Sequence, residues 1–402
     1  MEAQRTTAGS AYAADGRSLD LRGRARAAFA VAAAHAAAVD AQGRFPDEAF
    51  AEIRKNRLLG IMVPESIGGE GASIAEIVDV CYVIGQACGS AGLIYAMHQI
   101  KMACIVRHLC GNSALERVLQ RVVAEQLLLA SSTTEGQGGG DVRSSEAAIV
   151  REGDHVTLAR EATVISYGMQ ADGLVTTARR AADAPSGDQV LLVLLKSDYT
   201  LQRLQSWDTL GMRGTCSEGF TLRARAPAAQ LIAEPYEKIH AQTMVPCAHL
   251  MWGAVWMGIA AAAMGKAQAY VRNAVRQSNG RMPPGAAQYT QALSSLRTLR
   301  SVLACALQAY ETAMSDEKTI AGLEFQSMIT LTKVQASELA TSTVLGAMRA
   351  CGLSGYRNDS DFTIGRHLRD VLSGLLMINN ERILANLVTP SLLTPLPSTV
   401  GG

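Results

Sequence analysis

The 402-residue sequence lacks several features that would restrict its function directly. It has 37 Lys and Arg against 36 Asp and Glu, so no basic surface for nucleic acid or an anionic membrane is indicated. Residues 1–17 contain no apolar segment of the kind that a secretory signal requires. The longest apolar run, Leu250–Ala263, contains Gly253 and Gly258 and is too short to cross a bilayer. We therefore expect a cytoplasmic protein with no membrane insertion and no nucleic-acid partner.

The cysteines form no recognisable metal-binding or redox motif. No two of the eight make a CxxC pair, and their apolar surroundings are typical of reduced, mostly buried thiols. The zinc motif HExxH, the nucleophile motif GxSxG and the P-loop GxxxxGK[ST] are also absent. The sequence therefore gives no support to a metal centre. The cysteines are Cys81, Cys88, Cys104, Cys110, Cys216, Cys247, Cys305 and Cys351.

Three zones of the sequence differ in their hydrophobic pattern. Residues 24–129 are rich in Ala, Ile and Leu at helical spacing. Residues 130–238 contain short alternating or β-branched runs separated by turn signals, and residues 239–392 return to long helices. Residues 1–23 and 393–402 are expected to be flexible ends. The predicted fold class is α+β, mainly α, with an N-terminal helical domain, a central antiparallel β domain and a C-terminal four-helix bundle.

The bundle is predicted from four apolar-faced segments. They cover residues 246–278, 286–314, 319–351 and 378–388.

Two glycine-rich segments would allow backbone amides to approach a ligand closely. Ser131–Asp141 (SSTTEGQGGGD) precedes the β zone, so it does not suit a dinucleotide-binding motif that opens a helix. Its glycines and hydroxyls suit either a ligand-binding loop or an ordinary surface loop. Cys351–Tyr356 (CGLSGY) ends a predicted helix, as a helix C-cap would. Neither segment decides the function alone.

Six segments, in their order along the chain, resemble motifs of the acyl-CoA dehydrogenase family. TTEGQGGGD (133–141) resembles TEPGAGSD, TVISYG (163–168) resembles KTFITNG or KMWITNG, and LGMRGTCSEGF (210–220) resembles LGxRGS/T. RQSNGR (276–281) resembles RKQFGR, RACGLSGY (349–356) resembles QxxGGxGY, and RHLRD (366–370) resembles RYYRDA. The resemblance extends over about residues 24–390, and the order of the six motifs makes it specific.

The resemblance implies an FAD cofactor bound between the β domain and the bundle of a homodimer or homotetramer. In such proteins the cofactor carries the redox chemistry while the protein orients it and the substrate. Arg276 matches an arginine that reaches the FAD pyrophosphate across the subunit interface, a task that suits a forked guanidinium. The residues implied to contact the cofactor are Thr133, Thr134, Val164, Ser166, Arg276, Arg349, Gly352, Gly355 and Asn380.

Several of these positions depart from the family pattern. Val164 replaces an aromatic residue that often stacks on the flavin, and Asn380 replaces a cofactor-contacting Thr. Arg349 stands where the family usually has Gln, and Asn279 stands where it usually has Phe.

The catalytic carboxylate of the family has no counterpart at its usual positions. The resemblance places the Glu that removes the substrate α-proton at Ile378, and an alternative position on the first bundle helix at Ala248. His249 and Glu381 are the candidate replacements, since a near-neutral imidazole or a carboxylate can serve as general base. Each also has a structural interpretation: His249 as a packing residue and Glu381 as an acidic residue favoured by a helix dipole. A further interpretation is that the chemistry needs no strong base.

Two more substrate contacts follow from the resemblance. The backbone N–H of Ile378 would bind the thioester oxygen, a role that needs no side chain. Gly140 stands where relatives often carry a substrate-contacting Ser, and His249 stands where some carry an arginine on the substrate side.

Three functions remain open from the sequence. The first is FAD-dependent α,β-dehydrogenation of an acyl thioester, on CoA or a carrier protein, with an atypical base and an electron-accepting flavoprotein as partner. The second is a flavin-dependent monooxygenase or other atypical oxidoreductase that uses O₂ and needs no carboxylate. The third is a catalytically inactive acyl-binding homologue, against which the retained Thr134, Ser166 and Arg276 argue.

Overall fold

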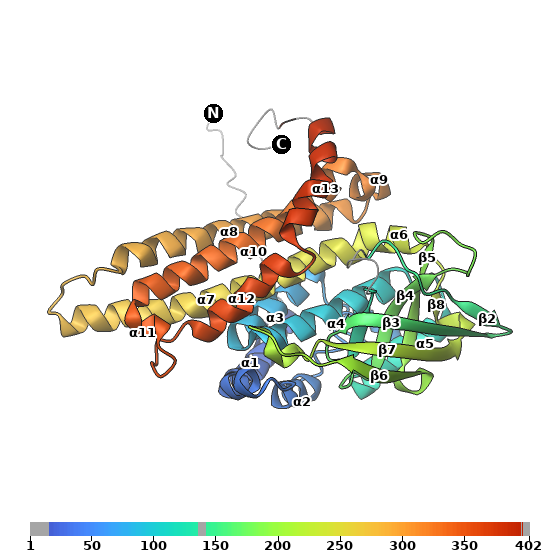
Figure 1. Ribbon diagram of the computed structural model, residues 1–402, viewed down its shortest axis with the longest axis horizontal. Helices are drawn as coiled ribbons and strands as arrows, with labels where there is room; N and C mark the ends of the chain where they lie inside the picture. The colour runs from blue at the N-terminus through green and yellow to red at the C-terminus, as the bar shows by residue number, and fades with distance from the viewer. Residues whose placement is uncertain (1–15, 136–141, 395, 397–402) are drawn as a thin grey trace, which may run out of the picture.

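The computed structural model describes residues 16–135, 142–394 and 396. Helices predominate, and the strands are confined to one end of the molecule, from which the long bundle helices extend away (Figure 1). The predicted fold class is confirmed: a helical N-terminal region, a central β region and a C-terminal bundle follow one another along the chain. Helix α1 begins at Gly16, so residues 16–23 are helical and not part of a flexible end.

In the N-terminal region, α1 to α4 lie under the bundle, whereas α5 lies beside the strands (Figure 1). Helix α3 begins with a capping box, in which Ser73 and Glu76 satisfy each other's backbone N–H groups. Helix α4 is buried along nearly its whole length, and α3 and α4 both contact the first long helix of the bundle. The helices are α1 (Gly16–Gln42), α2 (Asp47–Lys55), α3 (Ile74–Ala87), α4 (Gly89–Arg107) and α5 (Ser113–Glu125).

The β region consists of two four-stranded sheets. One has the order β1-β4-β5-β8 and the other β2-β3-β7-β6. All pairings between the named strands are antiparallel, as predicted, except that β1 runs parallel to β4. The chain crosses to the other sheet between these two strands, and such a crossover is what a parallel pair requires. The strands are β1 (Leu129–Ser132), β2 (Val150–Glu152), β3 (His155–Ile165), β4 (Gly173–Arg179), β5 (Gln189–Leu195), β6 (Tyr199–Gln205), β7 (Glu218–Pro227) and β8 (Leu231–Ile232).

The C-terminal region differs from the prediction at its fourth helix. A helix was expected over 378–388, but the helix that packs along the bundle is α12, and α13 turns away from it (Figure 1). The chain bends at Ile378 and Asn379, which both have positive φ values, 53° and 37°. The elements are α6 (Tyr236–Ile239), a π-helical turn η5 (His240–Met244), α7 (Val245–Gln277), α8 (Ala286–Ala313), α9 (Glu317–Ala321), α10 (Leu323–Cys351), α11 (Leu353–Tyr356), α12 (Gly365–Leu376) and α13 (Asn380–Leu393).

Helix α7 is the central element of the core. The continuous helical stretch Tyr236–Gln277 is apolar and long enough to cross a membrane, but 78% of its most apolar window is buried inside the protein. Its packing against α3 is close because glycines lie at the contact. A Cβ atom on Gly258 would lie 2.5 Å from the carbonyl oxygen of Tyr82, and one on Gly85 would lie 2.8 Å from that of Val255. The two backbones therefore touch, which fixes the position of α7 relative to the N-terminal region.

Two glycines of α7 give a matched test of this contact. Gly258→Ala should lower the free energy of unfolding by about 2 kcal/mol or more, because the new methyl group overlaps backbone atoms of α3. Gly265→Ala should leave it unchanged or raise it by up to about 1 kcal/mol, because Gly265 is exposed and has no atom within 4 Å of its Cβ position. Denaturant unfolding of both variants measures the difference. Equal effects would show that the contact is unimportant.

Candidate active site

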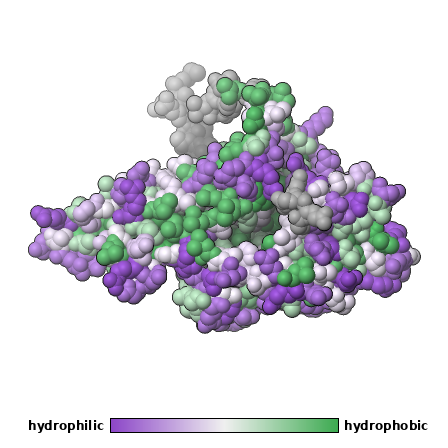
Figure 2. All heavy atoms as spheres, viewed as in Figure 1, coloured by the Kyte–Doolittle hydropathy of each residue, from purple (hydrophilic) through white to green (hydrophobic). Residues whose placement is uncertain are grey.

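A cavity of about 1000 Å³ lies between the β region and the bundle. Its walls come from α4, the chain after β1, the end of β3, the turn at residues 207–217, the start of α7, and the bend between α12 and α13. In Figure 2 the molecule is hollowed on the face shown, and hydrophobic residues border the hollow. The cavity therefore combines a wall of strand ends with a wall of apolar helix surfaces.

The turn at residues 207–217 joins the β region to α12. Asp370 is 4% exposed, and its Oδ1 accepts a hydrogen bond of 2.7 Å from the backbone N–H of Met212. Arg369 donates to the carbonyl oxygen of Leu210 at 2.9 Å and also pairs with Asp40 of α1. A Cβ atom on Gly211 would lie 2.0 Å from the Arg369 carbonyl oxygen. Two motifs far apart in the sequence, LGMRGT and RHLRD, thus meet to close one side of the cavity.

The strand wall carries the hydroxyl groups that the sequence predicted for the flavin. Thr133, Thr134, Val164 and Ser166 all line the cavity. The Ser166 Oγ lies 2.8 Å from the Oγ of Ser217, which is itself hydrogen-bonded to the side chain of Thr215. This chain of hydroxyls fixes the orientation of Ser166 within the wall.

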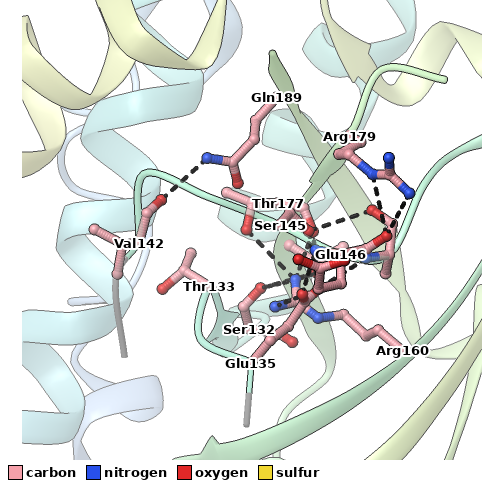
Figure 3. A network of polar contacts seen from close by, with 12 residues as sticks. Ser132, Thr133, Glu135, Val142, Ser145, Glu146, Arg160, Thr177, Arg179 and Gln189 are labelled. Atoms are coloured by element: carbon pink, nitrogen blue, oxygen red, sulfur yellow. Dashed lines mark hydrogen bonds and ion pairs between the residues drawn. The ribbon is translucent and has the colours of Figure 1, made fainter. Parts of the chain in front are cut away.

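A buried ion pair holds the segment that contains Thr133 and Thr134 (Figure 3). The Glu135 and Arg160 side chains are 8% and 1% exposed, and their closest charged atoms lie 3.3 Å apart. Arg160 also donates to the Ser132 carbonyl oxygen at 3.0 Å, and Glu135 accepts from the Ser145 hydroxyl at 2.8 Å. Glu135 is the one acidic residue among the described residues that line the cavity, and its charge is neutralised by Arg160.

His249 lies on the α7 wall, next to Ala248. It is 3% exposed, and its Nδ1 lies 2.9 Å from the carbonyl oxygen of Ile329. A carbonyl can only accept, so Nδ1 carries the proton and Nε2 is left with its lone pair. Burial lowers the pKa of His249 to about 4, and Lys333 lowers it as well. His249 is therefore neutral near pH 7 and has an acceptor nitrogen on the cavity wall.

The bend between α12 and α13 forms another part of the wall. Ile378 and Asn379 line the cavity in left-handed backbone conformations. Such conformations are uncommon for residues other than glycine, and for a β-branched residue they are strained. Among the described residues, none accepts a hydrogen bond from the Ile378 backbone N–H. This donor is therefore available to a ligand oxygen.

The two residues that follow this bend, Asn380 and Glu381, both lie outside the cavity lining but have different environments. Asn380 is 3% exposed and is not part of the cavity lining: its Oδ1 accepts from the Lys333 amine at 2.6 Å, and its Nδ2 donates to Ser337. Glu381 is exposed in the first turn of α13 and also lies outside the lining. Asn380 thus anchors the bend to α10. Glu381 lies in the first turn of α13, where the helix dipole favours an acidic side chain, so its position has a purely structural explanation.

The remaining predicted cofactor residues lie at the opposite end of the bundle. Arg276 is exposed in the last turn of α7, and Arg349 is exposed near the end of α10. Gly352 caps α10 with a φ of 57°, and Gly355 packs against Cys351. None of these four residues lines the cavity in the described part of the chain. Gly140 lies outside the described residues.

Several cavity residues were not identified from the sequence, among them Lys101, Trp207 and Trp252. Lys101 is buried in the wall formed by α4, and Trp207 lies in the turn that joins the β region to α12. Trp252 lines the cavity with a buried indole N–H that has no acceptor in residues 16–135 or 142–394. A single lysine within the apolar helical run IYAMHQIKMACIV was a visible signal for Lys101.

Comparison with known proteins identifies the family. Residues 18–126 match the N-terminal domain of acyl-CoA dehydrogenases, and residues 241–386 match the C-terminal domain. The chain is 26% identical over 348 residues to a probable acyl-CoA dehydrogenase of Bacillus subtilis, an alignment that covers 84% of this chain and 87% of that protein. The chain belongs to the acyl-CoA dehydrogenase family. It is an oxidoreductase with the FAD cofactor of that family, as the motifs predicted.

Solved structures share the fold over nearly the whole chain. Methanesulfinate monooxygenase from Pseudomonas fluorescens superposes with a TM-score of 0.80 and 18% identity, covering 94% of this chain and 97% of that one. Butyryl-CoA dehydrogenase from Megasphaera elsdenii superposes with a TM-score of 0.74 and 17% identity, covering 98% and 100%. At such identities the likeness establishes the fold alone.

The cavity fits the flavin of this family. The strand wall presents hydroxyl and backbone groups that suit the polar edge of a flavin, and the helix walls present apolar surface that suits its ring faces. The indole N–H of Trp252 is a buried donor in the lining without an acceptor among the residues described. A bound group with acceptor atoms would satisfy it.

Removing one half of the buried ion pair should loosen this wall. Glu135→Gln leaves the buried Arg160 charge unpaired, and should lower the free energy of unfolding by about 3 kcal/mol and reduce flavin retention. The matched control is Asp188→Asn, which breaks an exposed pair with Arg180 in the same region and should cost less than about 1 kcal/mol. Urea unfolding and the flavin content of the purified variants measure both. If the Glu135→Gln protein is as stable as the Asp188→Asn protein and retains as much flavin, the ion pair between Glu135 and Arg160 does not support the cavity wall.

Proposed function

We propose that the protein catalyses α,β-dehydrogenation of an acyl thioester with His249 as an atypical base. The observation that supports it most is the neutral imidazole of His249, which is buried in the cavity wall with an unprotonated Nε2. Ile378 occupies the position that the family resemblance assigns to the catalytic carboxylate, and no unpaired carboxylate lines the cavity among the described residues. Two imidazoles line the cavity among the described residues, and we assign the proton transfer to the buried one, His249, because His240 is only half-buried.

The residues of the chain divide the work of the reaction. Thr133, Thr134 and Ser166 would hold the flavin edge, and the N–H of Ile378 would bind the thioester oxygen, which would polarise the carbonyl and acidify the α-carbon. The Nε2 of His249 accepts the α-proton as the α C–H bond breaks. When bound, FAD supplies the two-electron acceptor for the hydride that leaves the β-carbon, so the acyl chain is oxidised to its α,β-unsaturated form. The apolar walls exclude water from these groups.

A second candidate is oxygenation of a small nucleophilic substrate with O₂. The observation that favours it is again the cavity without an unpaired carboxylate in its described lining, because such chemistry does not need a base for an α-proton. Anaerobic titration with a panel of acyl-CoA thioesters separates the two. Bleaching of the flavin without O₂ supports dehydrogenation. A flavin that no thioester bleaches, but whose reduced form consumes O₂ in the presence of a nucleophile, supports oxygenation.

We further propose that the active form is a homodimer or homotetramer. The predicted cofactor residues lie in two separate groups, one at the cavity and one at the far end of the bundle around Arg276 and Gly352. A second subunit that brings its far end to the cavity would unite them. The eight free thiols fit a cytoplasmic location, and an electron-accepting flavoprotein would reoxidise the cofactor.

Substitution of His249 tests the assignment of the base. His249→Gln keeps a donor for the Ile329 carbonyl but has no basic nitrogen, and should slow anaerobic flavin bleaching at least roughly tenfold. His249→Ala should do the same. Glu381→Gln is the control and should change the rate little, since Glu381 is exposed and lies outside the cavity lining. The reverse pattern would transfer the role to Glu381, and no effect from either would remove both.

The low pKa of His249 predicts the pH dependence of the same step. A base must be unprotonated to act, and the pKa of His249 is lowered to about 4 by burial. The bleaching rate should therefore stay level as the pH falls from about 8 to about 5 and drop only as it approaches about 4. A stopped-flow pH jump measures the rate before acid unfolding begins. A rate that already declines between about pH 8 and 6 points to a different base.

A further inference from the structure

Lys101 is a buried amine that no acidic side chain neutralises in residues 16–135 and 142–394. The residue is 4% exposed, lies in the middle of α4 and lines the cavity. Its Nζ lies 3.5 Å from the Sδ of Met244, which also accepts from the Tyr236 hydroxyl. A thioether is a weak acceptor. Within the described chain, no Asp or Glu forms an ion pair with Lys101.

The surroundings of Lys101 are apolar. Leu93, Met97 and Ile100 of α4 and Met244 of η5 line the same part of the cavity wall. Burial lowers the pKa of Lys101 to about 8, and the nearby Cys104 thiol offsets this only in part. Burying an ammonium group without a partner is costly, so lysines are rarely buried unless they are paired. Lys333, the other buried lysine beside this site, differs because it has the amide oxygen of Asn380 at 2.6 Å.

We propose that Lys101 binds a carboxylate at the far end of the acyl chain, so that the preferred substrates are thioesters of dicarboxylic acids. This inference rests on the proposed function, since it places an acyl chain in the cavity. The flavin-side hydroxyls and the Ile378 N–H belong to other walls, and α4 is left to contact the chain beyond the reacting carbons. A single carboxylate supplies the one charge that the wall lacks.

A phosphate group fits this position less well than a carboxylate. Phosphates of CoA or FAD carry more than one charge and are usually held by several donors. Along this wall Lys101 stands among apolar side chains, and its only described polar contact is a sulfur atom. The experiment distinguishes a phosphate from a carboxylate as the ligand of Lys101. If Lys101 bound a phosphate, its substitution would weaken the binding of every CoA thioester or of the flavin itself.

The test compares matched thioesters that differ only in the terminal group. Succinyl, glutaryl and adipoyl thioesters of CoA and of pantetheine, the portion that CoA and carrier proteins share, are paired with their butyryl, valeryl and hexanoyl counterparts. Binding to the flavin-loaded protein is measured by calorimetry, so that no turnover is needed. We expect at least one dicarboxylic thioester to bind at least roughly tenfold more tightly than its partner. Equal affinities across all pairs in the wild-type protein overturn the proposal without any variant.

Substitution of Lys101 then assigns the preference to this residue. Lys101→Met keeps the length and apolar character of the side chain but removes the charge, and should abolish the preference while leaving the flavin content unchanged. Lys101→Gln provides a second variant, and Lys266→Met, a partly buried lysine outside the cavity lining, should keep the preference. A preference that persists in both Lys101 variants overturns the proposal. So does loss of flavin from both, which would assign Lys101 to the cofactor.

The outcomes also distinguish this proposal from the proposed function. Bleaching by a monocarboxylic thioester together with equal binding of all pairs contradicts the carboxylate subsite alone. A Lys101-dependent preference for a dicarboxylic thioester that bleaches no flavin contradicts dehydrogenation alone.

Discussion

The hydrogen bond between the Asp370 carboxylate and the Met212 backbone N–H is the contact on which the site depends most directly. It joins the bundle to the β region at the edge of the cavity, where the backbones of Gly211 and Arg369 touch. Burial raises the pKa of Asp370 to about 6, although the Met212 N–H and the Arg366 charge oppose this rise, so the carboxylate is still mostly ionised near pH 7. The other walls are carried by α4 of the N-terminal region, by the β region or by the bundle, and this junction holds the last two together at the edge of the cavity.

The charges around the cavity follow one pattern. The acidic residue of the described lining, Glu135, is neutralised by Arg160. The closest hydrogen-bond partners described for the two buried amines, Lys101 and Lys333, are instead a sulfur and an amide oxygen. His249 is held neutral partly by its proximity to Lys333. The described cavity lining therefore contains an amine, that of Lys101, without a neutralising carboxylate among the described residues, and a positive charge of this kind stabilises negative charge on a bound oxygen.

Much of the fold and about half of the site could be predicted from the sequence. The three regions could be predicted because hydrophobic periodicity is a local property of the sequence. The family motifs pointed to four residues that all line the cavity: Thr133, Thr134, Ser166 and His249. The role of α12, the parallel β1–β4 pair and the inward turn of Asn380 depend on contacts between distant segments. The lone lysine in an apolar helical run was a visible signal for Lys101, but only the packing shows that its amine lies in the cavity wall.

The bend at Ile378 has a consequence for the evolution of the site. Glycine would adopt its φ of 53° without steric cost, whereas a β-branched residue there costs on the order of 1–3 kcal/mol. Replacement by glycine would relieve that strain and open space beside the flavin wall. The sec-butyl group is thus a case in which stability is traded for shape: it lines the cavity at the position that the family resemblance assigns to a carboxylate.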